Sequence, residues 1–388
     1  ALQSQSLAGL SSTQVGALTS AQVGALTVPQ MAALGTEQVA GISSTQAPSM
    51  AVSSMSRMST ASIGSLSTDA VASLTTTQLQ GLTSSQVRAM TTDQLVALTT
   101  GQMAGLGAAQ ASGLSGTQVA AMESVDIGKL LPTSVTALNT AAVQSLTNGQ
   151  LGSLSSAQVA GLNLTQVKAL TTSQMLGLGS SQAASLAAVQ MAGLSSDDMA
   201  AMNTSAFRAL TSSALAGLNS AQVRALSTSQ LTVLTTTQAT GLGALQAFGL
   251  SSTQVGVVST ANLVQLGNAT VSAIRADAIG GLLSSQVSAL TTSQVAALTA
   301  EQAQRMGTEQ VSGITTVQAA QLSGAALASL GTAAMAKLTA TQLTSLTSAQ
   351  VGSLTSEQVV ALTTAQAASL GAAQSVGLGS SQINALTS

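Results

Sequence analysis

The sequence contains no histidine, cysteine, tryptophan or tyrosine, and phenylalanine occurs only twice in 388 residues. Without histidine there is no imidazole that titrates near neutral pH or ligates a metal ion. Without cysteine there is no thiolate nucleophile, no zinc–sulfur site and no disulfide bond. These absences argue against an enzyme, so we expect no catalytic residue, no cofactor and no metal site.

Charged residues are also scarce. They make up 5% of the chain, nine basic and eleven acidic, for a formal net charge of −2. They form no basic patch that could follow a phosphate backbone, and the chain has almost no aromatic rings on which bases could stack. No apolar run approaches the roughly 18–20 residues that cross a bilayer. The sequence therefore predicts neither a nucleic-acid partner nor a membrane span.

What the sequence has in abundance is one octapeptide. Every eighth residue from Leu2 to Leu386 is Leu, Ile, Met or Val, which gives 49 such positions. Numbered to end on that residue, the octad reads [S/T/N/G]-[S/T]-x-Q-[V/L/M]-x-[A/G/S]-L, with Gln at position 4 in 33 of 48 full octads. Because the phase never shifts, the sequence predicts one continuous repeat domain over residues 1–388.

Four features predict that each octad is a short helix followed by a break. Ser or Thr at position 1 with Gln at position 4 forms a capping box. Pro29 and Pro132 lie in the first turn, where a missing N–H is tolerated, whereas Pro48 at position 6 predicts a distorted helix. Eight acidic residues are at position 3 and eight basic residues at positions 6 or 7, which complements a helix dipole. Apolar positions 5 and 8 are three residues apart, which is a helical spacing.

One continuous helix would not bury these residues, because eight residues overshoot two helical turns by roughly 80° and the apolar stripe would wind around the axis. We therefore predict an all-α solenoid of helices about two turns long, one per octad. Positions 5 and 8 should face inward, Ser, Thr and Gln outward, and the small residue at position 7 should let helices approach closely. A β-solenoid is the alternative, and the number of octads per turn stays open.

Octads that lack Gln at position 4 occur in clusters that start 64 or 72 residues apart. They divide the chain into super-repeats of 64–72 residues, and each cluster carries a basic residue, in most cases with acidic residues nearby. Duplication alone explains this pattern. The alternative hypothesis is an assembly seam between super-repeats or between molecules, which would consist of Arg57, Asp69, Glu123, Asp126, Lys129, Asp197, Asp198, Arg208, Arg275, Asp277 and Lys337.

The segments LTTSQVAAL at 290–298 and LTSEQVVAL at 354–362 resemble the L-T-x-x-Q-V-x-A-L arrays of long bacterial proteins. Those proteins are mostly predicted to be secreted or surface-attached and are labelled adhesin-like. The resemblance covers essentially the whole chain and implies an extracellular or cell-surface location. It transfers no catalytic residue, because such arrays have none to map.

These features favour an extracellular structural protein, either a surface stalk or the subunit of a self-assembling filament. The octads at 3–10 and 380–386 are scarcely more polar than the internal ones, so we expect head-to-tail association into a homopolymer, with little charge to oppose it. The cell surface or matrix is a further expected partner. The alternative is an adhesive or ligand-binding spacer that grips a surface, a glycan or ice. Phe248, at the variable position 6, is expected either to pack locally or to form an exposed contact.

Overall fold

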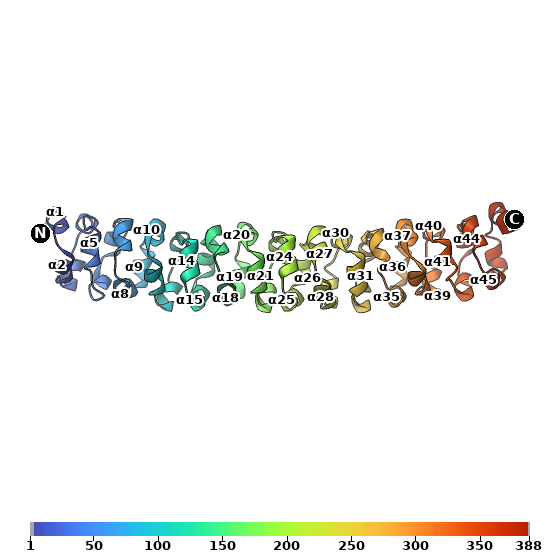
Figure 1. Ribbon diagram of the computed structural model, residues 1–388, viewed down its shortest axis with the longest axis horizontal. Coiled ribbons are helices and arrows are strands. Elements are labelled where there is room, and N and C mark those ends of the chain that lie inside the picture. Colours follow the sequence, from blue (N-terminus) through green and yellow to red (C-terminus); the bar gives the residue numbers. More distant parts are fainter. Residues whose placement is uncertain (1–3, 387–388) are drawn as a thin grey trace. The chain divides into compact units, whose positions relative to one another are not determined.

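The computed structural model describes residues 4–386, and over that range it contains α-helices and one 3-10 helix but no β-strand. The predicted all-α solenoid is therefore confirmed. Short helices follow one another along the chain, joined by brief extended segments (Figure 1). The chain divides into two compact units between Leu186 and Ala187, and each unit is described by itself.

The helices of the first unit share one placement, because each α-helix begins at position 2 of its octad and ends at position 5, 6 or 7. They are α1 (Ser4–Ala8), α2 (Ser12–Gly16), α3 (Ser20–Gly24), α4 (Val28–Ala32), α5 (Thr36–Ala40), η1 (Ala47–Ser49), α6 (Val52–Met55), α7 (Thr60–Gly64), α8 (Thr68–Ala72), α9 (Thr76–Gln80), α10 (Ser84–Ala89), α11 (Thr92–Val96), α12 (Thr100–Ala104), α13 (Ala108–Ala111), α14 (Gly116–Ala121), α15 (Ser124–Lys129), α16 (Pro132–Ala137), α17 (Thr140–Gln144), α18 (Asn148–Ser153), α19 (Ser156–Ala160), α20 (Leu164–Ala169), α21 (Thr172–Leu176) and α22 (Ser180–Ala183).

The second unit follows the same rule, except that its last helix extends to position 8. Its helices are α23 (Ala188–Met191), α24 (Ser196–Ala201), α25 (Thr204–Ala209), α26 (Ser212–Ala216), α27 (Ser220–Ala225), α28 (Thr228–Thr232), α29 (Thr236–Ala239), α30 (Ala244–Gly249), α31 (Ser252–Val257), α32 (Thr260–Leu263), α33 (Asn268–Ala273), α34 (Ala276–Ile279), α35 (Ser284–Ala289), α36 (Thr292–Ala296), α37 (Ala300–Arg305), α38 (Thr308–Ser312), α39 (Thr316–Ala319), α40 (Gly324–Ser329), α41 (Thr332–Met335), α42 (Ala340–Thr344), α43 (Ser348–Gly352), α44 (Ser356–Val360), α45 (Thr364–Ser369), α46 (Ala372–Ser375) and α47 (Ser380–Leu386).

The capping box sets where each helix begins, as the octad of α11 illustrates. Thr91 is extended, with φ −72° and ψ 160°, and its Oγ1 accepts a hydrogen bond from the backbone N–H of Gln94 at 3.1 Å. The Thr91 N–H donates in return to Oε1 of Gln94 at 2.8 Å. Because positions 8 and 1 lie outside most helices, the helical part covers four to seven residues and is shorter than the two turns expected.

Proline has the predicted effects. Pro29 and Pro132 lie in the first turns of α4 and α16, where no intrahelical N–H donor is required. Pro48 lies in η1, the one 3-10 helix of the described chain, in place of the α-helix that other octads form. The ring and the missing N–H at position 6 account for this distortion, which confirms the expectation for this octad.

The position-4 glutamines connect successive turns of the solenoid. Gln94 is 1% exposed, and its Nε2 donates to the carbonyl oxygen of Leu66 at 2.6 Å and of Ile63 at 3.1 Å, 28 and 31 residues earlier. The same pattern recurs in both units, for example from Gln294 to Leu266 at 2.7 Å. We call these amides and the carbonyl oxygens that they bind the glutamine ladder. The prediction that glutamine faces outward is wrong, because its amide satisfies carbonyl groups left free at the ends of helices.

The ladder and the helix packing together determine the size of one turn. Each helix packs against the helices three octads away, as α11 does against α8 and α14. Each ladder glutamine donates to the octad four places earlier. One turn of the solenoid therefore takes between three and four octads, a quantity that the sequence left open.

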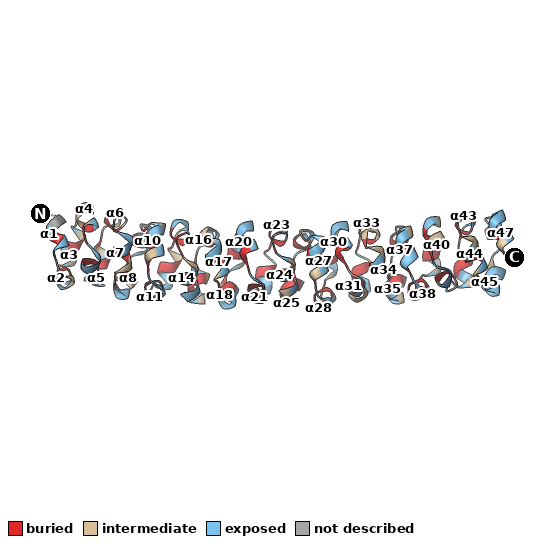
Figure 2. Cartoon of the chain, turned by 45° about the horizontal axis from the view of Figure 1, so that its top comes forward, coloured by how far each residue is buried: buried red, intermediate tan, exposed pale blue. Residues whose placement is uncertain are grey.

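Positions 5 and 8 form the core as predicted. Leu95 at position 5 is fully buried and Leu98 at position 8 is 4% exposed. The buried side chains lie on the inner sides of the helices, and the exposed ones lie on the outer surface (Figure 2). Phe207 also occupies a position 5 and is fully buried. No helix between residues 4 and 386 is long and apolar enough to span a bilayer.

Glycine at position 7 allows a closer approach than any other residue would. A Cβ atom added at Gly281 would lie 2.0 Å from the carbonyl oxygen of Ser252, in the octad three places earlier. Gly41 has the same relation to Ser12. No residue in the described range has a positive φ, so these glycines serve close packing and not an unusual backbone conformation. This confirms the role predicted for small residues at position 7.

Candidate functional site

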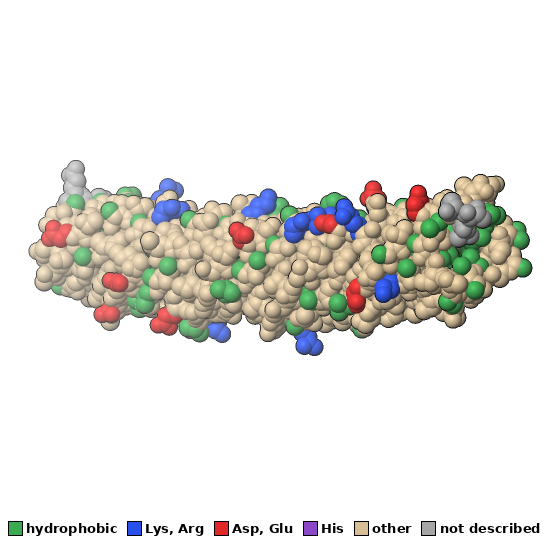
Figure 3. Space-filling view, turned by 45° about the vertical axis from the view of Figure 1, so that its right-hand side comes forward, with side chains coloured by type: hydrophobic (Ala, Val, Ile, Leu, Met, Phe, Trp, Pro, Cys, Tyr) green, Lys and Arg blue, Asp and Glu red, His purple; other side chains and the backbone are tan. Residues whose placement is uncertain are grey.

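The charged residues of the hypothetical assembly seam are mostly exposed and scattered among uncharged side chains (Figure 3). Only Arg275 and Asp277 form an ion pair among the residues that the structure describes, with Nη2 and Oδ2 3.3 Å apart. Arg275 is partly buried, and Asp126 and Asp198 are buried. The exposed members are Arg57, Asp69, Glu123, Lys129, Asp197, Arg208, Asp277 and Lys337. The seam remains a hypothesis.

The octads without glutamine have a reduced ladder. Ser134, Asn262 and Thr270 each donate one hydrogen bond to the carbonyl oxygen 28 residues earlier, at 2.6, 2.8 and 3.2 Å. Alanine at position 4, as in Ala70 and Ala278, has no side-chain donor for this bond. Each cluster of such octads is therefore a short stretch in which neighbouring turns are joined by fewer hydrogen bonds.

Asp126 replaces glutamine in one of these clusters. It is 5% exposed, and its Oδ1 has no hydrogen-bond partner. In the flanking octads Gln118 donates to Met90 and Ser134 donates to Leu106, each 28 residues earlier, so the same register sets Asp126 opposite the carbonyl group of Leu98. Burial, and to a smaller extent the charge of Glu123, raises the pKa of Asp126 above its ordinary value. The described residues include no group of three or more acidic side chains that could hold a metal ion.

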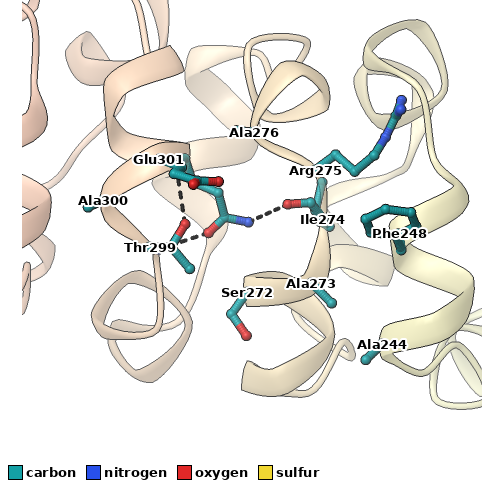
Figure 4. Close-up of a pocket in the computed structure, with 11 residues that line it drawn as sticks. Ala244, Phe248, Ser272, Ala273, Ile274, Arg275, Ala276, Thr299, Ala300 and Glu301 are labelled. Atoms are coloured by element: carbon teal, nitrogen blue, oxygen red, sulfur yellow. Dashed lines mark hydrogen bonds between the residues drawn. The ribbon is translucent and has the colours of Figure 1, made fainter.

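A surface groove in the second unit combines three side chains that depart from the octad pattern. The groove has a volume of about 590 Å³ and is lined by Ala244 and Phe248 of α30, by residues 272–276, and by residues 299–302. We call it the Phe248 groove. Figure 4 shows Phe248 beside Arg275 at one end and Thr299 and Glu301 at the other. These segments meet because they belong to octads three or four places apart, which is one turn of the solenoid.

Arg275 is the unusual residue of the groove. It is the one basic residue outside positions 6 and 7, and it replaces the Ser or Thr that normally caps the helix, so α34 begins without a side-chain cap. A positive charge at a helix start is unfavourable. Its guanidinium carbon lies 6.0 Å from the centre of the Phe248 ring, within the range of a cation–π contact. Phe248 itself is 54% exposed, so it forms an exposed contact surface and is not packed into the core.

An equivalent groove occurs 120 residues earlier, in the first unit, and lacks these side chains. It is lined by Gly152, Leu154, Ser155, Ser156 and residues 179–182, and its volume is about 480 Å³. Gly152, Ser155 and Ser181 stand there where the Phe248 groove has Ser272, Arg275 and Glu301. The groove is thus a property of the octad stack, and the second unit has added an aromatic ring and charges to one copy of it.

Residues 1–28, 77–108 and 191–228 match the family model of the ALTTAQ repeat. The chain is a repeat protein with regions similar to the ALTTAQ repeat. The six letters of that repeat correspond to positions 7, 8 and 1–4 of the octad, from the small residue to the ladder glutamine, as in residues 361–366. No curated protein matches the chain. The Phe248 groove lies outside the three regions that match the ALTTAQ repeat.

Sequence reasoning singled out Phe248 and Arg275 separately and did not connect them. It treated Ser272, Thr299 and Glu301 as ordinary octad residues. The usable signal was the position of Arg275, because a basic residue at position 1 contradicts the charge pattern of all the others. A residue that breaks a local rule without stabilising its own helix is often functional.

Proposed function

We propose that this chain is a structural protein that acts outside the cell, as a surface stalk or as the subunit of a filament. The observation that carries this proposal is the glutamine ladder, which recurs with the same 28- and 31-residue spacings in both units. Such a ladder distributes turn-to-turn bonding over many equivalent octads, as a load-bearing or spacing element requires. The absence of histidine and cysteine supports a role without catalysis.

Self-association follows from the same repetition. Because octads bind octads three and four places away, the surface that one octad offers to its neighbours is repeated along the chain. An octad of a second copy presents the same groups and can continue the stack. A head-to-tail contact of this kind does not close on itself and produces an open filament. The net charge of −2 offers little electrostatic repulsion against it.

Electron microscopy of the purified chain over a wide concentration range, in low and high salt, tests this proposal. We expect fibres with a uniform axial repeat that lengthen with concentration and persist in high salt, because the ladder consists of buried hydrogen bonds between uncharged groups. Particles that stay monomeric at every concentration would refute the filament and favour a passive stalk. Labelling of intact cells of the source organism with an antibody to the chain tests the extracellular location.

The assembly seam can be tested in the same experiment. Lys129 and Arg208 are exposed members of two clusters, and replacing each by serine removes its charge. If the clusters form the seam, the double variant assembles at a higher concentration than the wild type. Arg88 and Arg224 lie outside the clusters, so their double replacement by serine is a matched control. Equal assembly of both variants and the wild type would eliminate the seam.

A further inference from the structure

The Phe248 groove differs from its undecorated counterpart in the groups that it offers to a ligand. Its floor is apolar and consists of alanine side chains and Ile274, with the exposed ring of Phe248 at one end. Its polar groups are the hydroxyl of Ser272 and the carboxylate of Glu301, for which the described chain provides no ion-pair or hydrogen-bond partner. These side chains are added to a groove that the octad stack already forms at 152–182.

The charge of Arg275 is not available to recruit an anion. Nη2 of Arg275 is paired with Asp277 at 3.3 Å, and the guanidinium lies over the ring of Phe248. Its side chain is only 24% exposed. Arg275 therefore acts as a positioning residue that holds one face of the ring. The groups left open to a ligand are hydrogen-bond acceptors and a partly exposed aromatic edge and face.

We propose that the Phe248 groove binds a saccharide ring, with the C–H face of the sugar against Phe248 and the alanine floor and its hydroxyl groups donating to Glu301 and Ser272. Pyranose rings combine an apolar face with several hydroxyl donors, which matches an aromatic ring beside acceptors. The volume of about 590 Å³ lies within the roughly 300–1,000 Å³ that is usual for small-molecule sites. This binding site goes beyond the structural role and does not depend on self-assembly.

The composition of the chain makes a direct test possible. Phe207 and Phe248 are its only aromatic residues, and Phe207 is fully buried. Selective saturation of aromatic protons in heavy water, after exchange of the amide protons, therefore labels one exposed ring. Saturation-transfer NMR would use the full chain with methyl β-glucopyranoside, methyl β-galactopyranoside and methyl α-mannopyranoside. We expect transfer from Phe248 to ring protons of at least one glycoside.

Two variants and one control keep the result specific. Phe248→Ala should abolish the transfer, and Glu301→Gln should weaken binding at least threefold. Leu245→Ala is the control, because Leu245 is exposed on the same helix and does not line the groove. Alanine is already common at position 6, as in Ala104 and Ala160, so Phe248→Ala should fold normally, which a helical circular dichroism spectrum checks.

Three outcomes would overturn the proposal. They are the absence of transfer to all three glycosides, transfer that persists unchanged in Phe248→Ala, and transfer only to Nα-acetyl-lysine amide added as a basic peptide probe. The last outcome would assign the groove to a basic protein segment. Fibres or monomers in the electron microscope leave this test unaffected, so failure of the structural role and failure of the saccharide site can be distinguished.

Discussion

Replacing Gln94 by alanine removes one rung of the glutamine ladder without changing the aliphatic core. The substitution deletes the Oε1 acceptor that binds the Thr91 N–H at 2.8 Å and the Nε2 donor that binds the Leu66 carbonyl group at 2.6 Å. Gln22 is the matched control. It forms the same cap with Thr19 at 2.8 Å, but it is exposed and no ladder bond to an earlier octad is present.

The expected difference follows from the two sets of bonds. Loss of the exposed cap bond costs about 0.5–1.5 kcal/mol, and this cost is common to both variants. In Gln94→Ala the Leu66 carbonyl group also loses its buried donor, which costs a further ~1–3 kcal/mol. Since about 1.4 kcal/mol is a factor of ten, local opening around residues 59–66 and 91–98 should become roughly 5- to 150-fold more frequent than the cap alone explains.

Hydrogen exchange resolved by peptide measures this local opening directly, which a single melting temperature of a long repeat array does not. We expect faster exchange in both segments, although they are separated along the chain, because the rung joins them. Gln94→Met retains volume and lacks the donor, so it should resemble alanine. Equal effects of Gln94→Ala and Gln22→Ala, or an effect confined to residues 91–98, would refute the ladder as a source of turn-to-turn stability.

Three further predictions concern stability. Gly281→Ala should destabilise its turn by about 1–3 kcal/mol in hydrogen exchange, because the new Cβ would meet the Ser252 carbonyl oxygen, whereas Gly101→Ala, with nothing closer than 3.9 Å, should be neutral or stabilising; equal effects would contradict the close approach. The raised pKa of Asp126 means that its protonated form stabilises the fold below the ordinary pKa near 3.8 and that this stability is lost as pH rises through the raised value, so protection around Leu98 should fall between acidic and neutral pH. Asp126→Asn should abolish that pH dependence, as Asn262 already donates to Leu234 at 2.8 Å, and a retained dependence would assign it to another group. Phe207→Ala should cost about 3–5 kcal/mol in exchange experiments and Phe248→Ala almost nothing, and similar losses would mean that Phe248 is a core residue.

Much of the fold could be predicted from the octad because its signals are local. The capping box, the first-turn prolines and the charge pattern each act within one octad, so they located the helix start at position 2 without knowledge of the turn. The role of glutamine could not be predicted in full. Its Oε1 bonds within the octad, but its Nε2 bonds 28–31 residues earlier, and that distance depends on how many octads complete a turn.

The candidate site was beyond sequence reasoning for the same physical reason. Phe248, Arg275 and Glu301 are 26–27 residues apart and belong to three octads that a linear reading places far from one another. Their proximity appears only once the turn is known to take three to four octads. Arg275 was recognisable as an exception to the charge pattern, but its partners Phe248 and Asp277 gave it meaning only in three dimensions.

The direction of the glutamine ladder has a consequence for biosynthesis. The amide of each rung belongs to a later octad than the carbonyl oxygens that it binds, as Gln94 binds Leu66 and Ile63. During synthesis or passage through a membrane pore from the N-terminus, each new octad therefore finds its acceptors already in place. Such a chain can fold in sequence as it emerges, one octad at a time, and it need not wait for residues still to come.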